Sequence, residues 1–295
     1  MKGWLIYNGT NQVPKIAQLI RQLKQEADAL GLELALIPSN GIFAYYDHFG
    51  KPGLAPFDTG PDCDYILFWD KDVFLAKHLE QMGYHVFNSS DAIAACDNKL
   101  LMHQLLAGSG IRVPKTILGP FVYHRQVASE SQYKTMTALL GTPFILKEGK
   151  GSFGMQVYLI DSYGAYQDRL DALGDKRFIL QEYIRSSVGR DIRVNLIGNR
   201  IIGAMERTNP DDFRANITLG GAGQAIELTA EQESMALNAH QLLGLDFSGV
   251  DLLYDKDGGP ILCEVNSNVN FLSYEAVSGV PFGRYLLEYV IGCMQ

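Results

Sequence analysis

Two apolar segments late in the chain contain three side chains whose oxygen atoms could bind a cation. Asp251 stands in the segment 250–254, and Glu264 and Asn266 stand two residues apart at the end of the segment 261–265. Glycines between the two segments favour a β-hairpin, and residues two apart on a strand share a face. Carboxylate and amide oxygens suit a hard cation such as Mg²⁺. The alternative is a hairpin whose polar face meets water. Asn268 and Asn270 continue this face toward a ligand or solvent.

A glycine-rich loop follows a lysine in the middle of the chain. Residues 149–154 read Gly-Lys-Gly-Ser-Phe-Gly, and Lys147 ends the apolar segment before them. Because residues 155–160 read as a second strand, the loop is not the strand-to-helix turn that binds dinucleotides. Backbone N–H groups of such a hairpin loop can hold phosphates, and the Lys147 ammonium could reach the same phosphates. The alternative is a solvated surface turn.

Other catalytic patterns are absent from the sequence. Asp191 follows Gly-Arg, but no asparagine follows at the protein-kinase spacing, and the chain contains neither Asp-Phe-Gly nor the P-loop pattern GxxxxGK[ST]. The four cysteines are far apart and the six histidines are scattered, so neither zinc chemistry nor a disulfide framework is indicated. The Ser–His–Asp and Cys–His patterns that activate a side-chain nucleophile are also missing.

Composition excludes further classes of function. The chain has 295 residues, 47% of them hydrophobic, and a formal net charge of −8. Nucleic-acid and membrane-surface binding both favour a basic face, so neither partner is expected. No apolar run approaches the ~20 residues of a membrane span, and the N-terminus lacks the features of a signal peptide. We expect a cytoplasmic protein.

The first third of the chain alternates strand-like and helical patterns, which implies a small parallel α/β unit. The expected strands are 3–7, 32–37, 64–69 and 84–87, and the expected helices are 14–30 and 73–82. The segment 39–61 is rich in glycine, proline and aromatic residues and reads as a long loop. This N-terminal unit is expected to cover residues 1–90.

Pairs of strands joined by tight turns dominate from residue 143 onward, and the region from about residue 97 onward is expected to be α+β with antiparallel sheets. The expected pairs are 144–147 with 155–160, 192–197 with 200–205, and 250–254 with 261–265. Helical patterns cover 91–96, with Ser90 as its N-cap, and 99–107. Another helix follows Thr229, where Gln232 stands at capping-box spacing.

The order of these motifs resembles the ATP-grasp superfamily, and within it the branch of RimK-like amino-acid ligases. The resemblance covers roughly two thirds of the chain, from Asn88 to about Gly279, and each motif is modest but their joint order is specific. It is carried by segments 88–99, 110–116, 143–154, 181–184, 189–193, 206–207, 213–216 and 220–221, by Asp251 and by 264–266. It implies two antiparallel-sheet subdomains that clasp ATP: a central one at 91–184 and a C-terminal one at 185–295, which contains the metal site.

The resemblance also implies a role for each matching residue. Mg²⁺, with Mn²⁺ as an alternative, would bind Asp251, Glu264 and Asn266. The adenine would meet residues 181–184 and the ribose Asp191. Catalytic arginines would be Arg193, Arg207 and Arg214, whose planar forks fit carboxylate or phosphate. The nucleotide would contact Lys99, Lys147, Gly151, Ser152, Gly154, Gln181, Glu182, Tyr183, Ile184, Asp191, Arg214 and Asn216.

Three of these roles have structural alternatives. Tyr183 could simply be a core residue. Lys99 could be an ordinary solvated lysine on a helix. Arg193 could pair with Asp191, which lies two residues away on the same strand.

The implied activity is that of an ATP-dependent ligase. ATP would phosphorylate a carboxylate, and an amine would displace phosphate from the acyl phosphate. The amino acid added would be one such as glutamate, the acceptor a protein, peptide or small molecule, and the enzyme a homo-oligomer. The alternatives are a ligase for a carboxylate that is not an amino acid, a nucleotide-binding module without turnover, and a kinase.

The sequence departs from the family after the Glu-x-Asn motif that ends at Asn266. Glutamate-ligating members usually continue with small residues and a proline, whereas residues 267–275 read Ser-Asn-Val-Asn-Phe-Leu-Ser-Tyr-Glu. The identity of the amino acid therefore stays open. The segment 39–61 also reads as specific to this chain, and it would shape an acceptor site, a lid or an oligomer contact.

Overall fold

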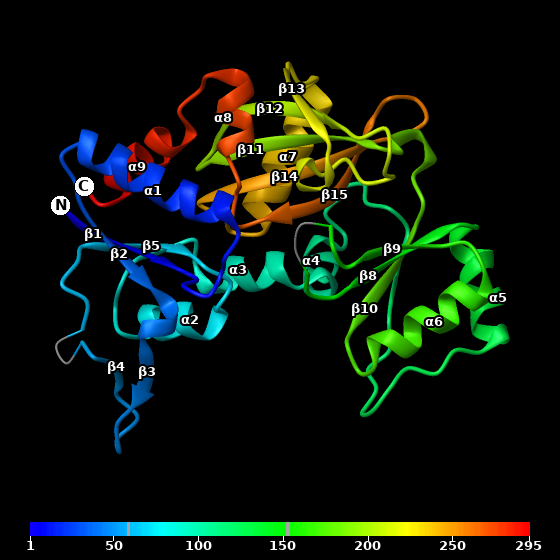
Figure 1. Ribbon diagram of the computed structural model, residues 1–295, viewed down its shortest axis with the longest axis horizontal. Helices are drawn as coiled ribbons and strands as arrows, with labels where there is room; N and C mark the ends of the chain where they lie inside the picture. The colour runs from blue at the N-terminus through cyan, green and yellow to red at the C-terminus, as the bar shows by residue number, and fades with distance from the viewer. Residues whose placement is uncertain (58–59, 152–153) are drawn as a thin grey trace.

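The N-terminal unit is a four-stranded parallel sheet with a helix on each face. The structure is a computed structural model that describes residues 1–57, 60–151 and 154–295 (Figure 1). The sheet order is β2 (Glu33–Pro38), β1 (Lys2–Tyr7), β5 (Tyr65–Trp69) and β6 (Val86–Phe87). Helix α1 (Pro14–Ala29) packs on the face that includes Leu5 and Leu67, and α2 (Val73–Gln81) packs on the face that includes Ile6 and Ile66. The predicted parallel unit is confirmed.

Burial on both faces explains why the central strand reads as an unbroken apolar run. All five residues of β5 are buried, because helices cover both sides of a parallel sheet. The alternating apolar–polar pattern of a half-exposed strand is therefore missing from this segment.

The segment 39–61 contains a β-hairpin where a long loop was expected. Strands β3 (Phe43–Tyr46) and β4 (Pro52–Ala55) pair antiparallel and project from the N-terminal unit (Figure 1). Contacts with α2 hold the hairpin: the Tyr46 hydroxyl donates to Gln81 Oε1 at 2.6 Å, and His78 Nε2 lies 2.8 Å from the Gly53 carbonyl oxygen. These contacts join segments that are distant in the sequence, so the local composition of the segment 39–61 did not predict the strands.

Two short helices link the N-terminal unit to the rest of the chain. Helix α3 (Ser90–Asp97) is capped by Ser89, not by Ser90 as predicted. The Ser90 hydroxyl instead donates to Glu80 Oε2 at 2.7 Å. Helix α4 (Lys99–Leu106) follows directly and is capped by the side chain of Asn98.

The central sheet is antiparallel and is covered by two helices. Its order is β7 (Thr116–Leu118), β10 (Phe178–Glu182), β8 (Phe144–Glu148) and β9 (Val157–Ile160). Helices α5 (Glu130–Leu140) and α6 (Tyr163–Leu173) contribute to one core with apolar side chains of the sheet. The opposite face, with Ile145 and Lys147, is left for the site.

The C-terminal sheet has five antiparallel strands. Its order is β13 (Ala222–Ile226), β12 (Arg200–Thr208), β11 (Arg190–Ile197), β14 (Phe247–Tyr254) and β15 (Pro260–Asn266). Apolar residues of α3, α4 and α7 (Ala230–Leu242) pack on one face. Helix α7 begins with the predicted capping box of Thr229 and Gln232. Together with the central sheet, this confirms the predicted pair of antiparallel-sheet subdomains.

The C-terminal helix packs against the N-terminal unit. After α8 (Leu272–Ser278), helix α9 (Phe282–Cys293) lies beside α1, and Phe282, Leu286 and Leu287 share a core with the N-terminal sheet (Figure 1). The domain boundaries at residues 90 and 184 remain predictions. Within the described ranges, no helix has both the length and the apolar character needed to cross a membrane.

Candidate active site

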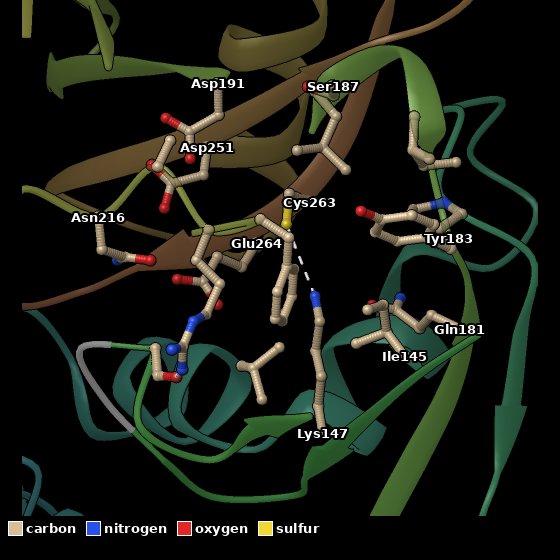
Figure 2. Close-up of a pocket in the computed structure, with 18 of the residues that line it drawn as sticks. Ile145, Lys147, Gln181, Tyr183, Ser187, Asp191, Asn216, Asp251, Cys263 and Glu264 are labelled. Atoms are coloured by element: carbon tan, nitrogen blue, oxygen red, sulfur yellow. Dashed lines mark hydrogen bonds between the residues drawn. The ribbon is translucent and has the colours of Figure 1, made fainter. Parts of the chain in front are cut away.

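The predicted site residues converge on a cavity between the central and C-terminal sheets (Figure 2). Arg193 and Asn266 line a second cavity, and Arg207, Asn216 and Glu264 line both. Ser152 lies outside the described residues. The first cavity is lined, among others, by Lys99, Lys147, Gly151, Gly154, Gln181, Glu182, Tyr183, Ile184, Asp191, Arg207, Arg214, Asn216, Asp251 and Glu264.

One end of the first cavity is lined by side chains without charge. Figure 2 shows Ile145, Gln181 and Tyr183 together at this end, away from Asp191 and Asp251. Sequence reasoning did not identify Ile145, Leu253 or Cys263, which also line the cavity. An end formed by uncharged side chains next to a charged part suits a ligand with a ring at one end and charges at the other.

Two buried ammonium groups lie at the charged part of the cavity without a carboxylate partner. Lys99 and Lys147 are each only 8% exposed. Among the described residues, no carboxylate oxygen lies within 4 Å of either Nζ, and Lys147 Nζ contacts Cys263 Sγ at 3.6 Å (Figure 2). Burial lowers the pKa of Lys99, and the nearby Glu264 carboxylate opposes this. Buried charges are normally paired, so this arrangement calls for an anionic ligand. The solvated role that Lys99 could have had does not fit its burial.

A β-bulge turns Glu264 toward the cavity. Asp251 stands opposite Glu264 in the β14–β15 ladder, but Leu252 stands opposite Leu262, so Cys263 is the extra residue. Strict alternation would have put Leu262 on the same face as Glu264. The bulge lets Leu262 enter the buried core while Cys263 and Glu264 both line the cavity. Bulges commonly redirect side chains next to active sites.

Asp251 lies in a buried cluster with two arginines. Arg193 donates to both oxygens of Asp251, with Nη2 to Oδ2 at 2.9 Å, and Arg207 Nη2 lies 3.0 Å from Oδ1. Burial raises the pKa of Asp251, but the two guanidiniums outweigh burial and leave the pKa below its usual value. The carboxylate that was predicted to be compensated by a metal ion is thus also compensated by arginines.

Arg193 does not pair with Asp191, the alternative left open by the sequence. Arg207 from the neighbouring strand takes that place, with Nε and Nη2 each 2.6 Å from one Asp191 oxygen. Burial outweighs the Arg207 charge at Asp191 and raises the pKa of that carboxyl. With two arginines and two aspartates, the cluster has no net charge.

The residues predicted to bind Mg²⁺ fit a small hard cation. Among the described residues no group of three or more His, Cys, Asp and Glu side chains could hold a metal. Mg²⁺, however, usually binds one or two carboxylates together with substrate phosphates. In the described part of the chain Glu264 accepts only from Asn266 Nδ2, at 3.3 Å, so its oxygens keep most of their acceptor capacity. The three guanidinium contacts on Asp251 leave room there for about one more bond.

The glycine loop and the segment after β12 meet over the cavity. Arg214 Nη1 donates to the Gly154 carbonyl oxygen at 2.6 Å, and Asp212 holds the other edge of the guanidinium. A Cβ atom on Gly154 would lie 2.9 Å from Asn216 Oδ1, and the φ angle of Gly154 is +72°. Gly154 therefore provides both a left-handed backbone and a close approach.

Gly154→Ala should weaken nucleotide binding about tenfold, because the new methyl group displaces Asn216 and strains the loop. Isothermal titration with Mg²⁺ and ADP measures this effect. Gly174→Ala is the matched control: Gly174 also has a positive φ, +63°, but a Cβ atom there would meet no described neighbour within 4 Å. Equal affinities of both variants would show that the close approach at Gly154 is unimportant.

The second cavity joins the first and is bounded by the N-terminal unit. Asn8 follows β1, and Asp70 and Lys71 follow β5, so all three stand at the carboxyl ends of parallel strands, where α/β sheets commonly bind ligands. The lining also includes Asn11, Lys15, Asn268, Asn270 and Ser273. Sequence reasoning singled out only Asn268 and Asn270 of these. No described residue of the segment 39–61 lines either cavity.

Two antiparallel sheets that enclose a cavity, preceded in the chain by a parallel α/β unit, define the ATP-grasp fold. D-alanine–D-alanine ligase from Bacillus anthracis, solved with ATP, superposes with a TM-score of 0.75 at 18% identity, covering 100% of this chain and 97% of that one. ATP-grasp ligase PsnB, solved with its minimal precursor, Mg and ADP, gives a TM-score of 0.72 at 17% identity, covering 99% and 97%.

The chain belongs to the RimK-like ATP-grasp family. The model of the RimK-like ATP-grasp domain matches residues 96–290. Beta-citrylglutamate synthase B of Danio rerio is 32% identical over 228 residues, which are 76% of this chain but only 55% of that protein. A probable alpha-L-glutamate ligase of Xanthomonas euvesicatoria is 33% identical over 218 residues, or 72% of this chain and 71% of that protein.

Proposed function

We propose that this protein is an ATP-dependent ligase that joins a carboxylate to the amino group of an amino acid, with glutamate as the amino acid. The observation that carries this proposal is the pair of buried lysines, Lys99 and Lys147, which have no carboxylate partner among the described residues. Glu264 lines the same cavity with free acceptor capacity. Buried cations and a free carboxylate in one cavity fit a polyanion that arrives with a divalent cation.

The nucleotide would lie with its base at the end formed by Ile145, Gln181 and Tyr183. Its phosphates would then meet Lys99, Lys147 and the backbone of the glycine loop. Glu264, Asn266 and the remaining acceptor of Asp251 would hold Mg²⁺, which when bound supplies positive charge to the phosphate oxygens. Arg214 and Asn216 close the loop over the phosphates and limit the access of water.

The carboxylate substrate would meet the terminal phosphate where the two cavities join. Arg193 and Arg207 both line the second cavity, and their contacts with Asp191 and Asp251 hold the guanidiniums rigidly. Their remaining N–H groups can orient a carboxylate, which is the positioning on which phosphoryl transfer depends. The carboxylate oxygen attacks the terminal phosphorus and ADP leaves. The amine then attacks the acyl carbon, and phosphate leaves with the former carboxylate oxygen.

Glutamate as the amino acid is supported by the relatives and by the second cavity. The relatives include a beta-citrylglutamate synthase and a probable alpha-L-glutamate ligase. Asn268 and Asn270 line the cavity, and their buried Oδ1 atoms have no partner among the described residues. Lys15 adds a positive charge without an ion-pair partner in the described part of the chain. Amides and a cation suit the ammonium and carboxylate groups of an amino acid.

Hydroxylamine trapping tests this proposal, because hydroxylamine takes the place of the amine and only the carboxylate has to be found by screening. Protein, ATP and Mg²⁺ are incubated with hydroxylamine and with single carboxylates: the twenty amino acids, citrate, N-acetylaspartate and short peptides that end in glutamate. An acyl phosphate would yield a hydroxamate, which is detected by its ferric complex. Hydroxamate formed with one carboxylate supports the ligase. ADP release without hydroxamate for any carboxylate would contradict it.

Lys15→Met should raise the KM for the amino acid about tenfold, because it removes a charged partner for a carboxylate, while the KM for ATP stays the same. Steady-state ADP release at varied amino acid measures both constants. Lys24→Met is the matched control on the same helix, since Lys24 pairs with Asp28 at the surface and lines neither cavity. A rise in both KM values would show that Lys15 acts on the nucleotide or on the fold instead.

The proposal has three finer parts. We propose that Mn²⁺ can replace Mg²⁺ at the oxygen ligands, that the enzyme works in the cytoplasm, where ATP and free amino acids are available, and that it forms a homo-oligomer. Titration of activity with Mn²⁺ tests the first part. Fractionation of cells and light scattering of the purified protein test the other two.

A further inference from the structure

The side-chain amide of Gln181 makes hydrogen bonds with two residues that do not line the nucleotide cavity. Gln181 lines the uncharged end of the cavity and is only 1% exposed. Its Nε2 lies 2.9 Å from Thr116 Oγ1 and 3.1 Å from His103 Nε2. Thr116 is on the neighbouring strand β7, and His103 is on α4, one turn after Lys99. Neither Thr116 nor His103 lines the cavity.

Thr116 determines which end of the amide faces it. The Thr116 hydroxyl donates its one proton to the Pro114 carbonyl oxygen at 2.7 Å. Its Oγ1 can therefore only accept a hydrogen bond from Gln181. The amide nitrogen must face Thr116, because the reversed amide would place two acceptor oxygens against each other.

His103 takes the second amide proton. Gln181 Nε2 has two protons, and one is used by Thr116, so the other points to His103 Nε2. His103 must then accept, which requires a neutral ring protonated on Nδ1. Burial, together with the charge of Lys147, lowers the pKa of His103 to about 4, so the ring is neutral at physiological pH. Both amide protons are thus engaged by the protein.

The carbonyl oxygen of Gln181 is the polar atom left for a ligand. The described residues provide no donor to Gln181 Oε1, while the residue lines the cavity. An oxygen that can only accept favours a ligand group that donates. The 6-amino group of adenine donates, whereas the 6-oxo group of hypoxanthine or guanine can only accept.

We propose that His103 and Thr116 fix the Gln181 amide with Oε1 toward the base, and that this fixed orientation makes the site select a 6-aminopurine over a 6-oxopurine nucleotide. The inference rests on the proposed binding of the base at the uncharged end of the cavity. Gln181 contacts the base, while His103 and Thr116 are positioning residues. If either acceptor is lost, the amide can turn and present its N–H groups, which a 6-oxo group accepts.

The test compares the binding of ADP and inosine diphosphate with Mg²⁺ by isothermal titration. These nucleotides differ only at position 6 and in the adjacent ring proton, and neither requires the unknown substrates. The wild type should bind ADP at least about tenfold more tightly, because the wrong base leaves a buried acceptor unpaired. In His103→Leu and in Thr116→Val, this ratio should fall about tenfold toward equality, mainly through tighter binding of inosine diphosphate.

Two further variants separate positioning from general damage. His103→Gln keeps an acceptor near the position of Nε2, so the ADP preference should be retained. Gln104→Leu changes the neighbouring exposed residue of the same helix and should leave both affinities unchanged. Equal loss of affinity for both nucleotides in His103→Leu would mean a structural role and would overturn the inference.

The outcomes also separate this inference from the proposed function. If wild type binds ADP tightly and the ratio is the same in His103→Leu and Thr116→Val, the amide is not fixed in this way, although the nucleotide site stands. If the wild type binds neither nucleotide, the proposed function itself fails. Thermal unfolding of each variant shows whether the protein is folded during the titration.

Discussion

Glu264→Gln should lower kcat/KM by about 10³-fold, or ~4 kcal/mol of transition-state stabilisation, with little change in thermal stability. Glu264 is a carboxylate of the first cavity that pairs with no arginine or lysine in the described part of the chain. The amide keeps the size of the side chain but removes the charge that a divalent cation needs. Because Glu264 is in no ion pair with a described residue, folding should lose little.

Steady-state ADP release with the carboxylate found by hydroxylamine trapping measures this effect. Glu148→Gln is the matched control, since Glu148 ends the strand next to the glycine loop and pairs with the exposed Lys176. That variant should keep activity within about threefold, because Glu148 lines neither cavity. A Glu264→Gln enzyme with more than a tenth of wild-type activity would mean that the metal ligands lie elsewhere.

Arg207→Met should reduce the free energy of unfolding by about 3–5 kcal/mol and abolish activity. Arg207 donates to both oxygens of Asp191 and contacts Asp251, and all three side chains are buried. Without this guanidinium, Asp191 has no ion-pair partner among the described residues, and Asp251 keeps only Arg193. Breaking a buried ion pair by removing one partner is costly, because the remaining charge stays buried without compensation.

Urea denaturation measures the loss, with an unchanged m-value as the sign of a simple stability effect. The control is Arg284→Met, which breaks an exposed pair with Glu288 one helical turn away and should cost at most about 0.5 kcal/mol. Asp191→Asn combined with Arg207→Met should recover part of the stability. A loss below about 1 kcal/mol in Arg207→Met would show that water or side-chain rearrangement replaces the guanidinium.

The sequence was sufficient for the three strand pairs and for most of the first cavity. The strands of these pairs lie within a few residues of their predicted positions, because period and turn residues are local signals, whereas β10, β13, α5 and α6 were not predicted. Lys147, Asp251 and Glu264 carry charge in otherwise apolar strands, which makes them stand out in the sequence. These three residues meet in one cavity as expected.

Features that depend on contacts between distant segments could not be predicted. The bulge at Cys263 became visible only when Leu252 was found opposite Leu262. The pairing of Arg193 with Asp251 and of Arg207 with Asp191 depends on the order of strands β12, β11 and β14. The second cavity is lined by loops of the N-terminal unit and by the end of β15. These segments are far apart in the sequence, so no local pattern predicts that they lie together.

The measurement that tests the central claim most directly follows one oxygen atom. A carboxylate substrate labelled with ¹⁸O is supplied with ATP, Mg²⁺ and glutamate, and the released phosphate is analysed by mass spectrometry. An acyl phosphate requires one labelled oxygen in the phosphate for each amide bond formed. The proposed mechanism predicts this ratio, with neither label transfer nor amide in Glu264→Gln. Amide formation with unlabelled phosphate, or ADP release without amide, would contradict it.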